Sequence, residues 1–359
     1  LIFTDTSIPN ATTTDYAPFV FSTNGSWMNA HFNFGQRPFI FTPPEGYETI
    51  SSANIEPPSI LNPKKHFECL TYTGDGSSNN RVTGLQFKPD LVWIKSFSAS
   101  TDNVVQDSVR GNFILYPNGQ NPDGATGGGW VKSFNPDGFT TDANGPINTN
   151  SASYAAWCWK AGGNSNTFNV DGVGYASASA AGITDGTVPL TGASVNKKAG
   201  FSIVTYDGNN SGSTTIGHGL SQAPEIWFNK SRDNTENWRV YYTVADGSYD
   251  FMYLNTADPV NHSGYALPTA TVVNKADDNG ESMVAYFWHS VPGYSKMGSY
   301  YGNGSNDGKF VYTGFKPAFV LLKRHTDSSN YWEIRDNKRV TNNPNNERSV
   351  SYTHLTLPT

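Results

Sequence analysis

Charged residues are scarce in this chain. Lys, Arg, Asp and Glu make up 15% of its 359 residues, against about 25% in an ordinary globular protein. The formal net charge is −6, and Lys and Arg nowhere form a block. Nucleic-acid affinity and binding to an acidic membrane surface both depend on clustered positive charge. The sequence therefore predicts no nucleic-acid partner.

Long apolar runs and cysteines are also lacking. The most hydrophobic stretches, such as residues 319–322, have the length of a strand. They are far shorter than the roughly 18 residues that a membrane span needs. We therefore expect no membrane span. Two cysteines, Cys69 and Cys158, cannot build a disulfide framework or a four-ligand zinc site. We expect both to be buried free thiols.

Candidate catalytic groups show no convergent spacing. Seven histidines are scattered along the chain without a His-x-x-x-His pair, which is the spacing typical of a metal site on a helix. A glycosidase needs two carboxylates about 5–10 Å apart across a cleft, whereas most acids here lie in Gly-containing turns such as Asp123-Gly124. The sequence predicts no enzyme, no metal site and no cofactor.

Glycine, proline and aromatic residues are abundant instead. The chain has 35 Gly, 21 Pro and 14% aromatic residues. Large aromatic groups offset the entropy cost of ordering, so the chain folds. Short apolar runs are separated by Gly, Asn, Asp and Pro clusters without a helical period, and this pattern indicates an all-β fold.

One pattern occurs three times. A Tyr is followed after 17 or 18 residues by a Pro, and the Pro is followed after 6 residues by a Lys. We interpret the Tyr as part of a strand that ends in a Gly-containing turn, and the Pro as the opening of the next strand. The Lys is expected to keep its charge in water. The three sets are Tyr72, Pro89 and Lys95; Tyr206, Pro224 and Lys230; and Tyr300, Pro317 and Lys323.

Two repeats share an acid followed by an Arg three residues later. These are Asp107 with Arg110, and Asp336 with Arg339. We interpret each as a salt-bridged corner and favour this over general-acid chemistry. Repeat 2 has no clear equivalent.

The repeats divide the chain. Repeat 1 covers residues 63–163, repeat 2 residues 200–295 and a shortened repeat 3 residues 296–349. Residues 164–199 are rich in Gly, Ala and Ser and are predicted to be a loose insertion or linker. Residues 1–62 form a separate segment that ends in a Pro-rich connector. The predicted fold class is all-β, with tandem antiparallel β-sandwich modules of jelly-roll or concanavalin-like type.

Two resemblances meet in this chain. The run Phe32–Phe39, with Pro43, Pro44 and Gly46, resembles the end of a SPRY-like, concanavalin-type domain found in virion proteins of marine tailed phages. The runs Phe87–Lys95, Asp107–Gly111 and Ala156–Lys160 resemble a repeated domain of uncharacterised function that follows it in those proteins. The resemblance implies a structural protein of a tail fibre or appendage, located in the extracellular virion.

Both ends of the sequence suggest a fragment. The chain starts with Leu1 and has no leader pattern. Residues 350–359 resemble one reading frame of a sequencing adapter, which we expect to be foreign to the fold. An assembled metagenome fragment would have both features.

Aromatic residues are the candidate binding groups. Trp238, Tyr241, Tyr242 and Tyr249 lie close together in repeat 2, and outward-facing rings could stack on sugars or on another chain. Core packing is the alternative for each ring.

We therefore expect a non-enzymatic virion protein that contacts other tail subunits and a host surface glycan. A homo-oligomer, trimeric if fibre-like, is implied by that class of protein. Two alternatives remain open: a secreted bacterial lectin-like module, and accessory repeats of a polysaccharide-degrading enzyme.

Overall fold

A computed structural model describes residues 58–125, 130–143, 145–163, 165–184, 186–209, 214–274, 280–305, 308–327, 330–339 and 349–350. The chain divides into two compact units, Leu1–Pro57 and Pro58–Thr359. The predicted SPRY-like segment at residues 1–62 lies, up to residue 57, outside the described residues. The expected adapter segment lies outside them from residue 351 onward.

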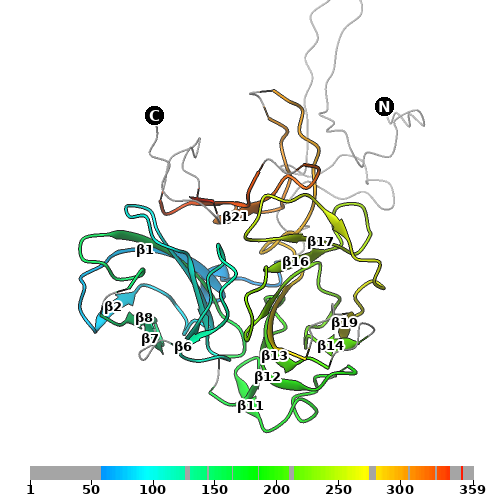
Figure 1. Cartoon of the computed structure of the whole chain (residues 1–359), viewed down its shortest axis with the longest axis horizontal. Helices are drawn as coiled ribbons and strands as arrows, with labels where there is room; N and C mark the ends of the chain where they lie inside the picture. The colour runs from blue at the N-terminus through cyan, green and yellow to red at the C-terminus, as the bar shows by residue number, and fades with distance from the viewer. Residues whose placement is uncertain are drawn as a thin grey trace, which may run out of the picture. The chain divides into compact units, whose positions relative to one another are not determined.

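The described residues are almost entirely strand and turn, as predicted (Figure 1). One short 3₁₀ helix, η1 (Pro63–Lys65), precedes the strands. The strands up to the end of repeat 1 are β1 (Phe67–Thr73), β2 (Asn80–Thr83), β3 (Leu91–Ser96), β4 (Val104–Asp107), β5 (Phe113–Ile114), β6 (Gly124–Ala125), β7 (Val131–Asn135), β8 (Gly138–Thr141) and β9 (Ser153–Trp159).

The later strands follow in two groups. Those up to the end of repeat 2 are β10 (Phe168–Val170), β11 (Val173–Tyr175), β12 (Leu190–Asn196), β13 (Phe201–Asp207), β14 (Thr215–Gly217), β15 (Ile226–Ser231), β16 (Arg239–Tyr242), β17 (Asp250–Tyr253), β18 (Asn261–His262), β19 (Val272–Asn274) and β20 (Ser282–Trp288). Repeat 3 contributes β21 (Phe319–Leu322), β22 (Glu333–Asp336) and β23 (Ser349–Val350). No helix in this part of the chain is long and apolar enough to span a membrane.

Repeats 1 and 2 each contain four antiparallel strands in the same order. Repeat 1 has the strand order β1-β9-β3-β4, and the nine-stranded sheet of repeat 2 contains β13-β20-β15-β16 in the same order. The registers also agree, because Trp159 pairs with both Phe67 and Leu91, and Trp288 pairs with both Phe201 and Ile226. In each repeat the last strand along the chain, β9 or β20, therefore lies in the sheet between the first and second long strands of that repeat. We call β9 and β20 the closing strands.

The closing strands are buried on both faces. In β9, Trp157 and Trp159 contribute to one hydrophobic core, while Tyr154 and Cys158 contribute to a second. Side chains on a strand alternate between its two faces, so an apolar run without polar alternation is the expected sequence of such a strand. The second core of repeat 1 lies beneath the sheet β2-β8-β7, and that of repeat 2 beneath β14-β19, which gives each repeat a two-layer sandwich.

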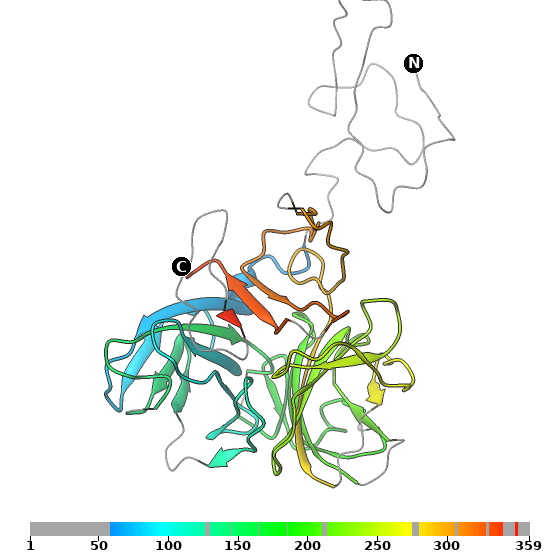
Figure 2. The ribbon, with the colours of Figure 1, turned by 45° about the horizontal axis from the view of Figure 1, so that its top comes forward.

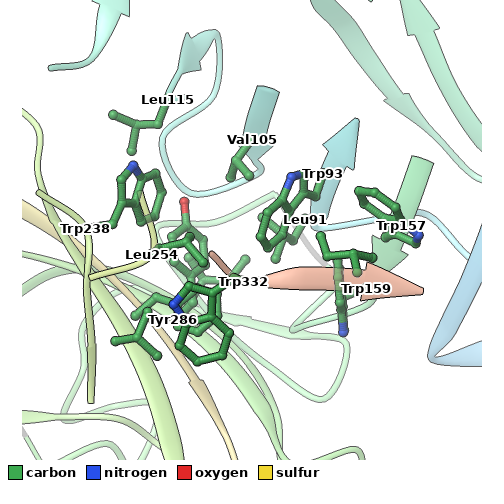
Figure 3. Close-up of a cluster of buried hydrophobic side chains, with 14 of the residues drawn as sticks. Leu91, Trp93, Val105, Leu115, Trp157, Trp159, Trp238, Leu254, Tyr286 and Trp332 are labelled. Atoms are coloured by element: carbon green, nitrogen blue, oxygen red, sulfur yellow. The ribbon is translucent and has the colours of Figure 1, made fainter. Parts of the chain in front are cut away.

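All three repeats share the first core. Figure 3 shows Trp93, Trp157 and Trp159 of repeat 1 converging with Trp238 and Tyr286 of repeat 2. Trp332 of repeat 3 lies in the same cluster, and the ring of Phe319 stands 5.9 Å from that of Trp157. The repeats are thus parts of one hydrophobic unit. We call this the shared core.

Residues 164–199 are part of a sheet and not a loose segment as predicted. The segment predicted to be a loose insertion or linker is ordered, because it contributes β10, β11 and β12 to the nine-stranded sheet, and β10 runs parallel to β12. Val195 and Ala193 of this segment are fully buried. Its small residues suit the structure because β12 packs closely, and a Cβ at Gly192 would lie 2.9 Å from Val109. Composition alone does not distinguish such packing from flexibility.

Repeat 3 forms only part of the pattern. Strands β21, β22 and β23 form a sheet with β21 at its edge. Residues 298–305, predicted to hold the first strand of this repeat, form no strand. In repeats 1 and 2 the first strand pairs with the closing strand, and the described part of repeat 3 has no closing strand. Within the described residues, the segment 298–305 therefore has no closing strand to pair with.

A buried histidine makes the second core of repeat 2 sensitive to acid. The Nδ1 atom of His218 accepts a hydrogen bond from the Leu220 amide at 3.2 Å, and Nε2 lies 3.2 Å from the Thr269 carbonyl oxygen. This arrangement fits a neutral ring with its proton on Nε2. Burial lowers the pKa of His218 to about 4 from 6.5.

Acidification should therefore weaken the fold through His218. The unfolded chain binds this proton below pH 6.5 and the folded chain only near pH 4, so stability falls as the pH drops between these values. The loss attributable to His218 should approach about 3 kcal/mol. Urea denaturation at pH 8, 6 and 4 measures it as the difference between the wild type and His218→Asn. If both proteins lose the same free energy between pH 8 and pH 4, His218 is not responsible.

Candidate functional site

The aromatic residues predicted to bind a ligand are in the core. Trp238, Tyr241, Tyr242 and Tyr249 are each at most 5% exposed. Trp238 and Tyr242 belong to the shared core, and Tyr241 and Tyr249 belong to the second core of repeat 2. The expectation of outward-facing rings at these four positions is corrected, because the sheet that carries β16 and β17 is covered on both faces. Core packing, the alternative for each ring, is what the structure shows.

Two of the three repeat lysines, Lys95 and Lys230, are buried rather than solvated, and Lys323 is partly exposed. Lys95 is 6% exposed and Lys230 is fully buried. The Nζ atom of Lys230 donates to the carbonyl oxygens of Ser231 and Asn234, at 2.8 and 3.2 Å. Lys95 donates to the Thr101 carbonyl, and Lys323 to that of Ala257 at 2.9 Å. Lys95 and Lys230 thus fix the loop after their strand, whereas Lys323 bonds Ala257 of repeat 2 and also the Asn330 carbonyl after its own strand. Burial lowers the pKa of Lys230 to about 8.

The repeat prolines keep the position expected for them. The strands β3, β15 and β21 each begin two residues after their proline, Pro89, Pro224 or Pro317. The repeat tyrosines differ in their surroundings. The hydroxyl of Tyr72 donates to the Ile147 carbonyl at 2.7 Å, and Tyr206 is fully buried, whereas Tyr300 is 51% exposed.

Both acid–arginine corners are ion pairs, as predicted. Nε of Arg110 lies 2.6 Å from Oδ2 of Asp107, and Nε of Arg339 lies 2.5 Å from Oδ2 of Asp336. In both corners the other carboxylate oxygen accepts hydrogen bonds from the backbone amides two and three residues later, at 2.9–3.0 Å. The two corners are structural equivalents.

Each corner holds the closing strand of another repeat. The Tyr286 hydroxyl of β20 donates to Oδ2 of Asp107 at 2.7 Å, and Nη2 of Arg110 donates to the same hydroxyl at 3.1 Å. Nε1 of Trp157 in β9 donates to Oδ2 of Asp336 at 3.2 Å. Trp157 and Tyr286 occupy the same register position in their strands. These corners lock repeat 1 to repeat 2, and repeat 3 to repeat 1.

The corner of repeat 1 belongs to a larger buried network. Arg110 also pairs with Asp123, and Asp123 accepts from Nε of Arg232 at 2.6 Å. The side chains of Arg110 and Asp107 are fully buried. Two arginines therefore face two carboxylates, which compensates the charge in an apolar setting. Sequence analysis missed Asp123, because its position in a Gly-containing turn indicated only a reversal of the chain.

No catalytic arrangement emerges from the described residues. No group of three or more His, Cys, Asp or Glu side chains there lies close enough to hold a metal ion. Cys69 and Cys158 are free and buried, as expected, and burial raises the pKa of both thiols. The small void within the shared core encloses about 10 Å³ and has mainly apolar walls, including Leu91 and Trp93. It has at most the size of one water molecule.

The strongest candidate for a binding surface is an exposed aromatic segment in repeat 3. Tyr301 is 85% exposed, Tyr312 79% and Phe310 76%, and Tyr300 and Val311 are about half exposed. We call residues 298–305 and 308–314 the aromatic segment, which belongs to the orange trace above β21 in Figure 1 and at the upper end of the coloured ribbon in Figure 2. Solvated aromatic rings close together in sequence mark interaction sites. Sequence analysis missed the segment because its Tyr was interpreted as part of a strand.

Comparison with known proteins identifies the family. Residues 62–355 match the family model described as "Domain of unknown function (DUF7483)". The chain belongs to this family. No curated protein and no solved structure matches the chain. The family match spans all three repeats, in agreement with a core that they share.

Proposed function

We propose that this DUF7483 chain is a non-enzymatic structural component of a phage tail fibre or tail appendage that contributes to attachment to a host surface glycan. The observation that carries this proposal is the aromatic segment. Three rings that are each more than three quarters exposed lie within 12 residues. Flat rings of this kind stack on the C–H faces of sugars, and they are costly to expose in water without a partner.

The remainder of the described residues between 58 and 350 is suited to support the aromatic segment mechanically. Repeats locked by buried ion pairs and by one core form a rigid base. Neighbouring tail subunits are the other expected partners, and assembly as a homo-oligomer, trimeric in a fibre, belongs to the proposal. The resemblance of the repeat motifs to a repeated domain of marine tailed-phage virion proteins supports the same class.

The glycan contact predicts a specific loss. The double variant Tyr301→Ala and Tyr312→Ala should bind roughly 30-fold more weakly than the wild type, since each stacked ring contributes about 1 kcal/mol. The measurement is binding to an array of bacterial lipopolysaccharides and capsular polysaccharides. Circular dichroism should show an unchanged fold, because both rings are exposed.

Leu267→Ala is the matched control, because Leu267 is 53% exposed and lies in repeat 2. It should leave array binding unchanged. Equal binding by the wild type and the double variant, or no array signal from the wild type, would count against glycan attachment through this segment.

The gene neighbourhood separates the phage proposal from the alternatives. Long-read sequencing across the locus should find tape-measure, baseplate or capsid genes beside the gene for this chain. A signal peptide or a hydrolase domain in the same frame, without virion genes nearby, would instead favour a bacterial lectin-like protein or an enzyme accessory module.

A further inference from the structure

The three repeats contact one another in a cyclic order with one missing step. The corner of repeat 1 holds the closing strand of repeat 2, and the corner of repeat 3 holds that of repeat 1. A third contact would join the corner position of repeat 2 to a closing strand of repeat 3. The described residues provide the first half of that contact and not the second.

Register identifies the corner position of repeat 2 as Tyr242. Asp107 pairs with Leu91, Asp336 with Phe319 and Tyr242 with Ile226, at equivalent places in the three sheets. Tyr242 is 5% exposed, and its hydroxyl has no hydrogen-bond partner among the described residues. A buried hydroxyl without a partner is unfavourable and needs an explanation.

Strand β21 of repeat 3, whose Phe319 and Leu321 pack on the shared core that contains Tyr242, also has an open edge. β3 and β15 are each paired on both sides, whereas β21 pairs only with β22 in the described part of the chain. Strands β3 and β21 therefore differ in how far their side chains are buried. All six residues of β3 are buried, but all four residues of β21 are partly exposed. An open edge presents unpaired backbone groups to an incoming strand.

The segment of repeat 3 that corresponds to the first strand of repeat 1 also lacks its pairing strand among the described residues. The Gly-Asn-Gly turn at Gly302–Gly304 corresponds to Gly74–Gly76, and Gly304 and Gly76 share φ angles of 68° and 69°. Tyr300 therefore corresponds to Tyr72, whose ring stacks on Tyr154 of the closing strand at 5.0 Å. In repeat 3 the ring of Tyr300 is half exposed, and no strand among the described residues covers it in this way.

We infer that the open edge of β21 is an acceptor for one added antiparallel strand with the sequence pattern of β9 and β20. The pattern is an Ala or Val facing Lys323, an aromatic residue with an N–H or O–H group facing Leu321, and a Trp facing Phe319. The polar group of the middle aromatic residue satisfies the Tyr242 hydroxyl. Strand addition then covers the ring of Tyr300 as the closing strand covers that of Tyr72.

The acceptor edge and the glycan surface use different rings. Tyr301 corresponds to Thr73 and Asp207, which are exposed although their strands are complete. Tyr301 therefore stays in solvent after strand addition, and the acceptor edge does not depend on glycan binding. A matched pair of variants follows: Tyr300→Ala removes a ring that the strand buries, and Tyr301→Ala removes its neighbour.

The test uses a peptide with the sequence of residues 153–160, with Cys158→Ser and two terminal lysines for solubility. Isothermal titration should give one peptide per chain. Hydrogen exchange should show new protection of the backbone amides at residues 319–323. Tyr300→Ala should weaken binding at least fivefold, and Tyr301→Ala should leave it unchanged. Tyr242→Phe should fold normally and bind roughly 2- to 10-fold more weakly, the effect of one hydrogen bond.

The control is a peptide of the same composition in which the side-chain pattern is shifted by one position. If this peptide paired with β21 in the same register, both Trp rings would lie on the opposite face of the sheet. It should not bind. The inference is overturned if neither residues 153–160 nor residues 282–289 bind as peptides, or if binding leaves residues 319–323 unprotected. It is also overturned if both peptides bind equally well to the wild type and to Tyr300→Ala. Self-association that the peptide does not disperse would mean that a second copy occupies the edge.

Discussion

Replacement of Arg110 by methionine should lower the free energy of unfolding by about 3–5 kcal/mol. Arg110 is fully buried and pairs with both Asp107 and Asp123. Its removal leaves two buried carboxylates, of which Asp123 keeps its ion pair with Arg232 and Asp107 loses its ion pair with Arg110. The Tyr286 hydroxyl also loses a hydrogen bond from Arg110. Urea denaturation at pH 7, followed by tryptophan fluorescence, measures the change.

Arg81→Met is the matched control for this prediction. Arg81 forms an ion pair with Asp137 at 2.7 Å, but both side chains are about half exposed. Pairs in water contribute at most about 1 kcal/mol, so this variant should remain close to the wild type. Equal effects of the two substitutions would show that the Arg110 network does not hold repeats 1 and 2 together.

Replacement of Trp157 by alanine should cost about 3–5 kcal/mol, the range for removing a large aromatic side chain from a core. Trp157 is fully buried, with Trp93 at 6.0 Å and Phe319 of repeat 3 at 5.9 Å between ring centroids. Arg339 lies over its ring at 5.5 Å. The substitution therefore removes packing within repeat 1 and between repeats 1 and 3.

Trp157→Phe separates packing from hydrogen bonding. It retains most of the buried ring but removes the N–H group that donates to Asp336, so the expected loss is about 1–3 kcal/mol. Because the repeats share a core, the whole unfolding transition should move to lower urea concentration in the alanine variant. A separate early transition of repeat 3, with the remainder unchanged, would show instead that the repeats unfold independently.

The repeat could be predicted from the sequence because it rests on local chemistry. The Tyr-to-Pro and Pro-to-Lys spacings reflect strand lengths and turns, and they correctly indicated β strands at Leu91–Ser96 and Ile226–Ser231. The spacing of three between Asp107 and Arg110 correctly indicated an ion pair, because an Asx-type turn closes within those four residues. Such features need no knowledge of distant parts of the chain.

The burial of individual side chains could not be predicted in the same way. Tyr242 and Lys230 look solvated beside polar neighbours, but each lies in a sheet that a second layer covers. Which residues stay exposed depends on strand pairing over long distances, such as β13 with β20. For the same reason the aromatic segment of repeat 3 could not be found, since its Tyr residues suggested a strand and residues 298–305 form none.

The central claim, that this chain is part of a phage tail, is tested most directly by its location on particles. Antibodies raised against the purified chain, with a gold label, should be applied to phage particles that carry the gene and viewed by electron microscopy. We predict that gold lies on tail fibres or tail appendages and that soluble chain competes it away. Gold confined to bacterial cell surfaces, with unlabelled tails on particles whose genome encodes the chain, would contradict the account.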